Sequence, residues 1–175
     1  MSISAKIIGM IIIMLSTTGY GIVLSRDIKA RLKELKELKK IVFLLKGEIG
    51  FGHTPILEAF DNISRRCGEP FKSIIGNFVS YGEKSSKQPF SEIWQQGFSY
   101  ELHRTHLSKD ERERLADLGE ELGLNDVKTQ QSAIDNYAME LDMNIESLSK
   151  ILPGRVKLYN SMGLMLGIVI AIIMI

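Results

Sequence analysis

This 175-residue chain has few cysteines and prolines and almost no net charge. It has one cysteine, four prolines and a net charge of +1. A single cysteine excludes an internal disulfide, and the near-zero charge provides no bulk attraction for nucleic acid. Phosphate-binding loops, nucleophile elbows and paired zinc motifs are absent as well. We therefore expect no enzyme, no cofactor and no nucleic-acid partner.

Metal binding is not predicted either. His103 and His106 are three residues apart, a spacing that can place two imidazoles on one helical face. No further histidine or cysteine completes a ligand set. Cys67 ends an apolar helical pattern and is interpreted as a small core residue.

Charge is distributed very unevenly along the chain. Apart from Lys6, every charged residue lies between Arg26 and Lys157. This leaves two apolar segments, 7–24 and 158–175, each about 27 Å long as a helix, which is close to the thickness of a bilayer core. A signal peptide is the alternative for the first segment, and the many basic residues after it argue against export.

The basic residues also predict topology. Lysines and arginines follow the first apolar segment and precede the second. The positive-inside rule therefore places the middle of the chain in the cytoplasm and both termini across the membrane. We expect transmembrane helices in 1–24 and 158–175 and a cytoplasmic domain in 25–157.

The middle of the chain is predicted to be all-α. Apolar residues keep a heptad-like spacing over 28–49 and again over 127–152. Shorter stretches between them show helical periodicity, and no alternating strand pattern of useful length occurs. The fold class is an antiparallel bundle of about six helices, flanked by an N-terminal and a C-terminal transmembrane helix.

Several helix ends have recognisable signals. Thr54 is expected to cap the helix that starts at Pro55, and Ser108 with Glu111 fits a capping box. Gly123 suits the position after a helix, and the Asn-Asp pair at 125–126 can cap the helix that follows. Pro153, with the glycine after it, is expected to end or kink that last helix.

Acidic residues on the short helices and turns form the candidate partner-binding site. If they gather on one face of the bundle, they offer an acidic patch to a basic partner. The alternative is that they are ordinary solvated positions. The candidates are Glu58, Asp61, Glu69, Glu120, Glu121 and Asp126.

Gly163 and Gly167 form a small-xxx-small motif in the last apolar segment. Such motifs let two membrane helices approach closely. Packing within the hairpin of the two segments needs no partner and is the default, and packing against a neighbouring subunit is the alternative.

Three stretches together resemble the stage III sporulation protein AB family. They are Glu48-Ile-Gly-Phe-Gly-His-Thr-Pro-Ile-Leu-Glu-Ala59, Leu118-Gly-Glu-Glu-Leu-Gly-Leu-Asn-Asp126 and Lys157-Leu-Tyr-Asn-Ser-Met-Gly-Leu-Met-Leu-Gly167. The family's soluble domain is similar to the cytoplasmic six-helix domains of F-type platform proteins in type II secretion and type IV pilus systems.

The resemblance implies a non-enzymatic platform in the channel complex between mother cell and forespore. It also implies a place in the outer forespore membrane, with the domain in the mother-cell cytoplasm. The implied partners are the secretion-type ATPase and other membrane proteins of the same operon. The alternative is a structural anchor or scaffold that self-associates through its heptad-like helices, without ATPase coupling.

Overall fold

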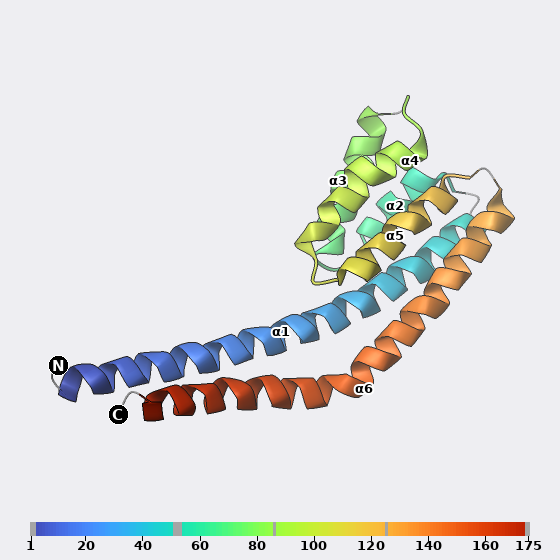
Figure 1. Ribbon diagram of the computed structural model, residues 1–175. Coiled ribbons are helices and arrows are strands. Elements are labelled where there is room, and N and C mark those ends of the chain that lie inside the picture. The colour runs from blue at the N-terminus through green and yellow to red at the C-terminus, as the bar shows by residue number, and fades with distance from the viewer. Residues whose placement is uncertain (1–2, 51–53, 86, 125, 174–175) are drawn as a thin grey trace. The chain divides into compact units, whose positions relative to one another are not determined.

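The computed structural model describes residues 3–50, 54–85, 87–124 and 126–173, and within them it is all-α, without a strand. Figure 1 shows two long helices and a group of shorter ones. The six α-helices of this described part are α1 (Ile3–Gly50), α2 (Ile56–Ser64), α3 (Phe71–Lys84), α4 (Phe90–Ile93), α5 (Lys109–Leu122) and α6 (Val127–Ile173).

The chain divides into two compact units, and α1 and α6 take part in both. The terminal unit comprises Met1–Ala30 and Ser147–Ile175, and the bundle unit comprises Arg31–Glu146. The division therefore falls inside the two long helices rather than at their ends. The bundle unit contains the whole of α2, α3, α4 and α5.

The periodic apolar positions of α1 form one side of the bundle core. Leu35, Leu38 and Leu45 are almost completely buried. Together with their neighbours at the same spacing they cover one stripe of the helix, as a heptad-like pattern requires. The predicted period of this helix is confirmed.

An aromatic cluster fills the centre of the bundle unit. Trp94 stacks on Phe98 with ring centroids 4.2 Å apart. Phe78 meets the Trp94 ring edge-on at 5.4 Å, and Phe60 meets Phe78 edge-on at 5.2 Å. Gly119 of α5 lies directly against the indole, because a Cβ there would be 2.0 Å from Trp94 Cδ1. Only glycine lets α5 approach this closely.

The helical run that starts at α4 is irregular. Four α-helical residues in α4 are followed by a π-helical turn, η1 (Trp94–Phe98), and a 3-10 segment, η2 (Ser99–Arg104). This run places Ile93, Trp94, Phe98 and Leu102 in the core. The sequence showed helical periodicity in this part of the chain, but it did not show the change of helical pitch.

The observed helix ends can be compared with the predicted cap residues. Ser108 and Glu111 form the predicted capping box, with Ser108 N–H donating to Glu111 Oε2 at 2.8 Å. Asp126 Oδ2 accepts from Thr129 N–H at 3.0 Å, so it caps α6 as predicted. Gly123 ends α5 in a right-handed conformation, with φ of −70°, and not in a left-handed cap.

One predicted helix end is wrong, and one of the two alternatives for another is excluded. Thr54 does not cap α2, because Pro55 occupies the cap position and the Thr54 hydroxyl donates to Glu48 Oε2 at 3.3 Å. Of the two alternatives for Pro153, an end of the helix is excluded, since α6 continues through it to Ile173, and a kink stays a prediction. Pro153 and Gly154 are both exposed, so the carbonyl that the proline leaves unpaired need not be buried.

Within the described residues, one helix passes a test of length and composition for crossing a membrane. It is the α1 segment Ile11–Gly50, where the most apolar 18-residue window has a mean hydropathy of 1.3. The second expected segment, 158–175, includes residues outside the described part of the chain. A two-pass topology therefore remains a prediction.

Candidate interaction surface

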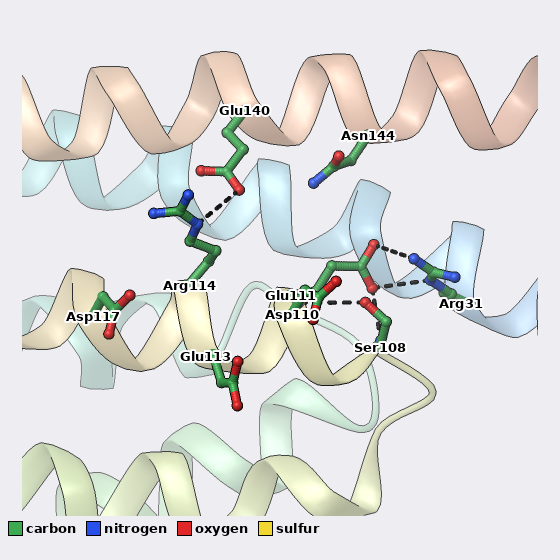
Figure 2. Close-up of a pocket in the computed structure, with 9 residues that line it drawn as sticks. All are labelled: Arg31, Ser108, Asp110, Glu111, Glu113, Arg114, Asp117, Glu140 and Asn144. Carbon is green, nitrogen blue, oxygen red and sulfur yellow. Dashed lines mark hydrogen bonds and ion pairs between the residues drawn. The ribbon is translucent and has the colours of Figure 1, made fainter.

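A polar groove lies between α5 and α6 in the bundle unit. It has a volume of about 580 Å³, and Figure 2 shows that its side chains come from α1, α5, α6 and the residue just before α5. Five carboxylates and two guanidinium groups line it, so the groove carries net negative charge. Its lining is Arg31, Ser108, Asp110, Glu111, Glu113, Arg114, Asp117, Glu140 and Asn144.

The end of the groove near α1 is held by a buried ion pair. Glu111 is 6% exposed, and its two carboxylate oxygens accept from Arg31 Nε at 3.0 Å and Nη2 at 2.9 Å. The same carboxylate accepts from Ser108 N–H, as part of the capping box. A bidentate arginine and a backbone N–H offset the desolvation of this buried charge. The pair fixes the start of α5 against α1.

The rest of the groove leaves most of its acids exposed. Arg114 Nε lies 3.5 Å from Glu140 Oε1 in a partly exposed pair across the groove. A smaller hollow of about 150 Å³ shares Arg114, Asp117 and Glu140 with the main groove and extends it to Glu121 and Asn136. The acidic surface therefore continues along α5. We call this combined surface the α5–α6 groove.

Tyr137 lies at the base of this extension. It is 7% exposed, and its hydroxyl finds no hydrogen-bond partner among the described residues. Burial raises the pKa of the Tyr137 hydroxyl well above its ordinary value, and the nearby charges of Glu140 and Glu111 raise the pKa further. The hydroxyl is therefore neutral and can donate a hydrogen bond to an acceptor.

Only one of the six predicted acidic residues lines the α5–α6 groove. Glu121 does so, while its neighbour Glu120 is exposed and lies 3.5 Å from Gln95 Nε2. Glu58 is exposed in the first turn of α2. Asp61 pairs with Arg65, the residue just after α2, at 2.6 Å.

The remaining two predicted acids have local structural roles. Glu69 Oε2 accepts from the Ser73 hydroxyl at 2.7 Å, and Asp126 accepts from both the hydroxyl and the N–H of Thr129. These hydrogen bonds lower the pKa of Asp126 below its ordinary value. Both carboxylates satisfy backbone donors near the start of a helix.

Most of the groove acids were not among the predicted site residues. Asp110, Glu113, Asp117 and Glu121 follow one another at steps of three or four residues, which places them along one side of α5. This helical spacing could have predicted an acidic side of α5 from the sequence. The contribution of Glu140 was not visible, because it depends on the packing of α6 beside α5.

The two histidines serve different partners and do not converge. His103 Nδ1 lies 2.6 Å from the Tyr100 carbonyl oxygen. His106 Nδ1 lies 2.7 Å from Glu34 Oε1, and its backbone N–H donates to Glu34 Oε2 at 2.6 Å. The described residues hold no cluster of three or more His, Cys, Asp or Glu suited to a metal ion.

Glycines bring the two helical segments of the terminal unit into close contact. A Cβ at Gly163 would lie 2.6 Å from the Thr17 carbonyl oxygen, and one at Gly167 would lie 2.7 Å from Thr17 Oγ1. A Cβ at Gly21 would lie 2.5 Å from the Tyr159 carbonyl oxygen. Each of these glycines therefore lies against the other helical segment of the terminal unit.

Fold and groove together define an α-helical bundle protein with an acidic groove between two of its helices. The chain belongs to the stage III sporulation protein AB family, whose model matches residues 6–175. It is similar to the stage III sporulation protein AB of Bacillus subtilis (strain 168), with 24% identity over 169 residues that cover 97% of this chain and 98% of the relative.

A solved structure agrees with the fold. A stage III sporulation protein AB structure aligns with a TM-score of 0.64 and 24% identity, and the alignment covers 70% of this chain and 96% of the other. The predicted family and the predicted all-α fold are both confirmed.

Proposed function

We propose that this sporulation protein is a non-enzymatic membrane platform, and that its α5–α6 groove binds a basic surface of a cytoplasmic secretion-type ATPase. The observation that carries the proposal is the groove itself. It contains six carboxylates against two guanidinium groups, and most of those carboxylates are exposed. Exposed charge of one sign speeds and orients the association of an oppositely charged partner.

The arrangement of side chains in the groove supports partner binding rather than catalysis. Glu111 is fully engaged with Arg31 and Ser108, which rigidifies one end. The acids farther along α5 have free carboxylate surface and lie on a regular helix rather than on a loop. A rigid acidic helix edge suits docking of lysines and arginines from a folded partner.

Placement in a membrane is part of the same proposal. The apolar part of α1 and the basic residues beyond it support an anchored protein with a cytoplasmic bundle unit. By family likeness the membrane is the outer forespore membrane, with the bundle unit in the mother-cell cytoplasm. In this arrangement the platform couples the ATPase to membrane components of the channel between the two cells.

Charge reversal in the groove tests the proposal. The full-length protein, solubilised in mild detergent, is used to capture the ATPase of the same operon. We expect Glu113→Lys with Asp117→Lys to reduce the captured ATPase at least tenfold, and the loss to be greater at low salt than at high salt. Glu58→Lys on α2 is the matched control, because it reverses an exposed acid away from the groove.

The outcomes separate three cases. Equal capture by the groove variant and the wild type would remove the groove from the proposal. Loss of capture only in the α2 control would favour the acids predicted near Glu58. A cysteine at position 85 that reacts with an impermeant reagent outside intact cells would contradict the cytoplasmic placement.

A further inference from the structure

A second groove lies on the opposite flank of α6, where it packs beside α1 in the bundle unit. Its volume is about 380 Å³. The floor is apolar: Val42 and Ile134 are both buried, and Ala138 and Gly47 add small residues. A Cβ at Gly47 would meet nothing within 4 Å. The hollow is therefore open rather than filled by the chain's own side chains.

Two ion pairs close the ends of this groove. Lys46 Nζ lies 2.5 Å from Asp135 Oδ1, and Lys39 pairs with Asp142. The lysines are seven residues apart on α1 and the aspartates seven residues apart on α6, in the reverse order. The two helices are therefore antiparallel here, and the pairs are about 10 Å apart along the groove. One rim is basic and the other is acidic.

Large apolar side chains stand exposed beside this groove. Phe43 lines it from the basic rim and is 75% exposed, the highest value among the large apolar side chains of the described residues. Met139, next to Ala138 on α6, is 67% exposed. Phe43 lies about midway between Lys39 and Lys46, and Ala138 lies about midway between Asp135 and Asp142. The projecting Phe43 ring and the small Ala138 therefore lie at the same height along the two antiparallel helices.

We propose that this groove is the interface with a second copy of the same chain. A two-fold axis running along the groove, parallel to both helices, places α1 of each copy over α6 of the other. Phe43 of one copy then sits over Ala138 of the other, against the apolar floor. An isologous interface requires such a self-complementary patch. Here the projecting Phe43 and the small Ala138 lie side by side at the same height along the groove.

The charges match in the same arrangement. Lys39 and Asp142 share one level of the groove, and Lys46 and Asp135 share the other. A two-fold axis along the groove keeps these levels, so each lysine faces the equivalent aspartate of the second copy as well as its own. Rotation about an axis across the groove would exchange the two ends and point the helices of the second copy the opposite way.

The direction of the helices favours the axis along the groove. It leaves α1 of both copies pointing the same way, as two chains anchored in one membrane require. Anchoring also raises the local concentration of the copies, so a small interface is sufficient. This step rests on the membrane placement proposed above, and not on binding of the ATPase.

Co-purification of two differently tagged full-length copies from mild detergent tests the interface. We expect Phe43→Glu to reduce the co-purified copy at least tenfold, because it puts a charge on the apolar floor of the partner. Gly47→Leu fills the hollow from an open position and should have the same effect. Tyr100→Glu, at another aromatic residue that is 71% exposed, is the matched control and should leave self-association intact.

Reversed charges give a second, independent readout. A copy with Lys39→Glu and Lys46→Glu should not self-associate, and neither should a copy with Asp135→Lys and Asp142→Lys. Mixing these two copies restores every contact between chains, so we expect them to co-purify with each other. No association of the wild type, or equal association of the wild type and Phe43→Glu, would overturn the interface. Failure of the mixed copies to associate would overturn the two-fold arrangement.

Discussion

Replacing Gly119 by alanine should destabilise the bundle unit, although alanine is the better helix former. The new Cβ would lie 2.0 Å from both Cδ1 and Nε1 of Trp94 and 2.2 Å from Cε2. Optimal carbon contacts are about 3.5 Å or longer, so the indole or α5 must move by about 1.5 Å. Trp94 is 1% exposed and stacked on Phe98, which leaves the ring little room to move.

The magnitude follows from two opposing effects. Overpacking a well-packed core costs up to about 3 kcal/mol or more, and this overlap is near the upper end because it involves one rigid ring. The gain in helix propensity from glycine to alanine is about 1 kcal/mol. The net loss is therefore about 2 kcal/mol. For a unit of this size we expect the melting temperature to fall by about 8 °C.

The assay is thermal and urea unfolding of the full-length protein in mild detergent. Circular dichroism follows the helices, and Trp94, the single tryptophan of the chain, reports on the contact by fluorescence. Gly76→Ala is the matched control, because its Cβ meets nothing within 4 Å, and it should stabilise by up to about 1 kcal/mol.

A double-mutant cycle isolates the clash. In a Trp94→Leu background the smaller side chain can yield, so the cost of Gly119→Ala should shrink. An unchanged or raised melting temperature for Gly119→Ala alone would refute the reasoning. An undiminished cost in the Trp94→Leu background would refute the assignment of the clash to the indole.

Three further substitutions test other parts of the structure. Glu111→Ala should cost about 2 kcal/mol in denaturant unfolding, because it removes both a cap and a buried pair, whereas Glu113→Ala on the exposed side should stay within about 0.5 kcal/mol. The wild type should be more stable than Asp126→Ala from about pH 5 to 7. Because hydrogen bonds lower the pKa of Asp126 in the folded state, this advantage should disappear as the pH falls below about 4. Gly163→Ile should weaken packing in the terminal unit by about 1 kcal/mol or more, measured by thermal unfolding in detergent, whereas Gly19→Ile meets no neighbour and should not.

Helix identity could be predicted because it depends on local order in the sequence. The repeat of Leu35, Leu38 and Val42 places apolar groups on one stripe whatever the stripe packs against. The capping box of Ser108 and Glu111 is local as well, since its two partners are three residues apart. Both predictions are confirmed.

Glu34 shows where local order is insufficient. It lies among the lysines and glutamates that separate the apolar positions of α1, yet it is 7% exposed. The groups that accompany its burial, the ring and backbone N–H of His106, are 72 residues away. No spacing within α1 marks one glutamate as different from the next. Its burial depends on which loop packs over it.

Each acid-lined groove or apolar hollow depends on two or more helices that are distant in the chain. The sequence by itself determined the all-α class, the apolar ends and the charged positions, because these follow from composition and short-range period. Three of its stretches also carried the resemblance to the family. Only the tertiary structure decided that Asp117 and Glu140 line one groove and that Phe43 and Ala138 lie beside another. The physical reason is that side-chain neighbours across a groove are set by the packing of two helices, which no local interval in the sequence records.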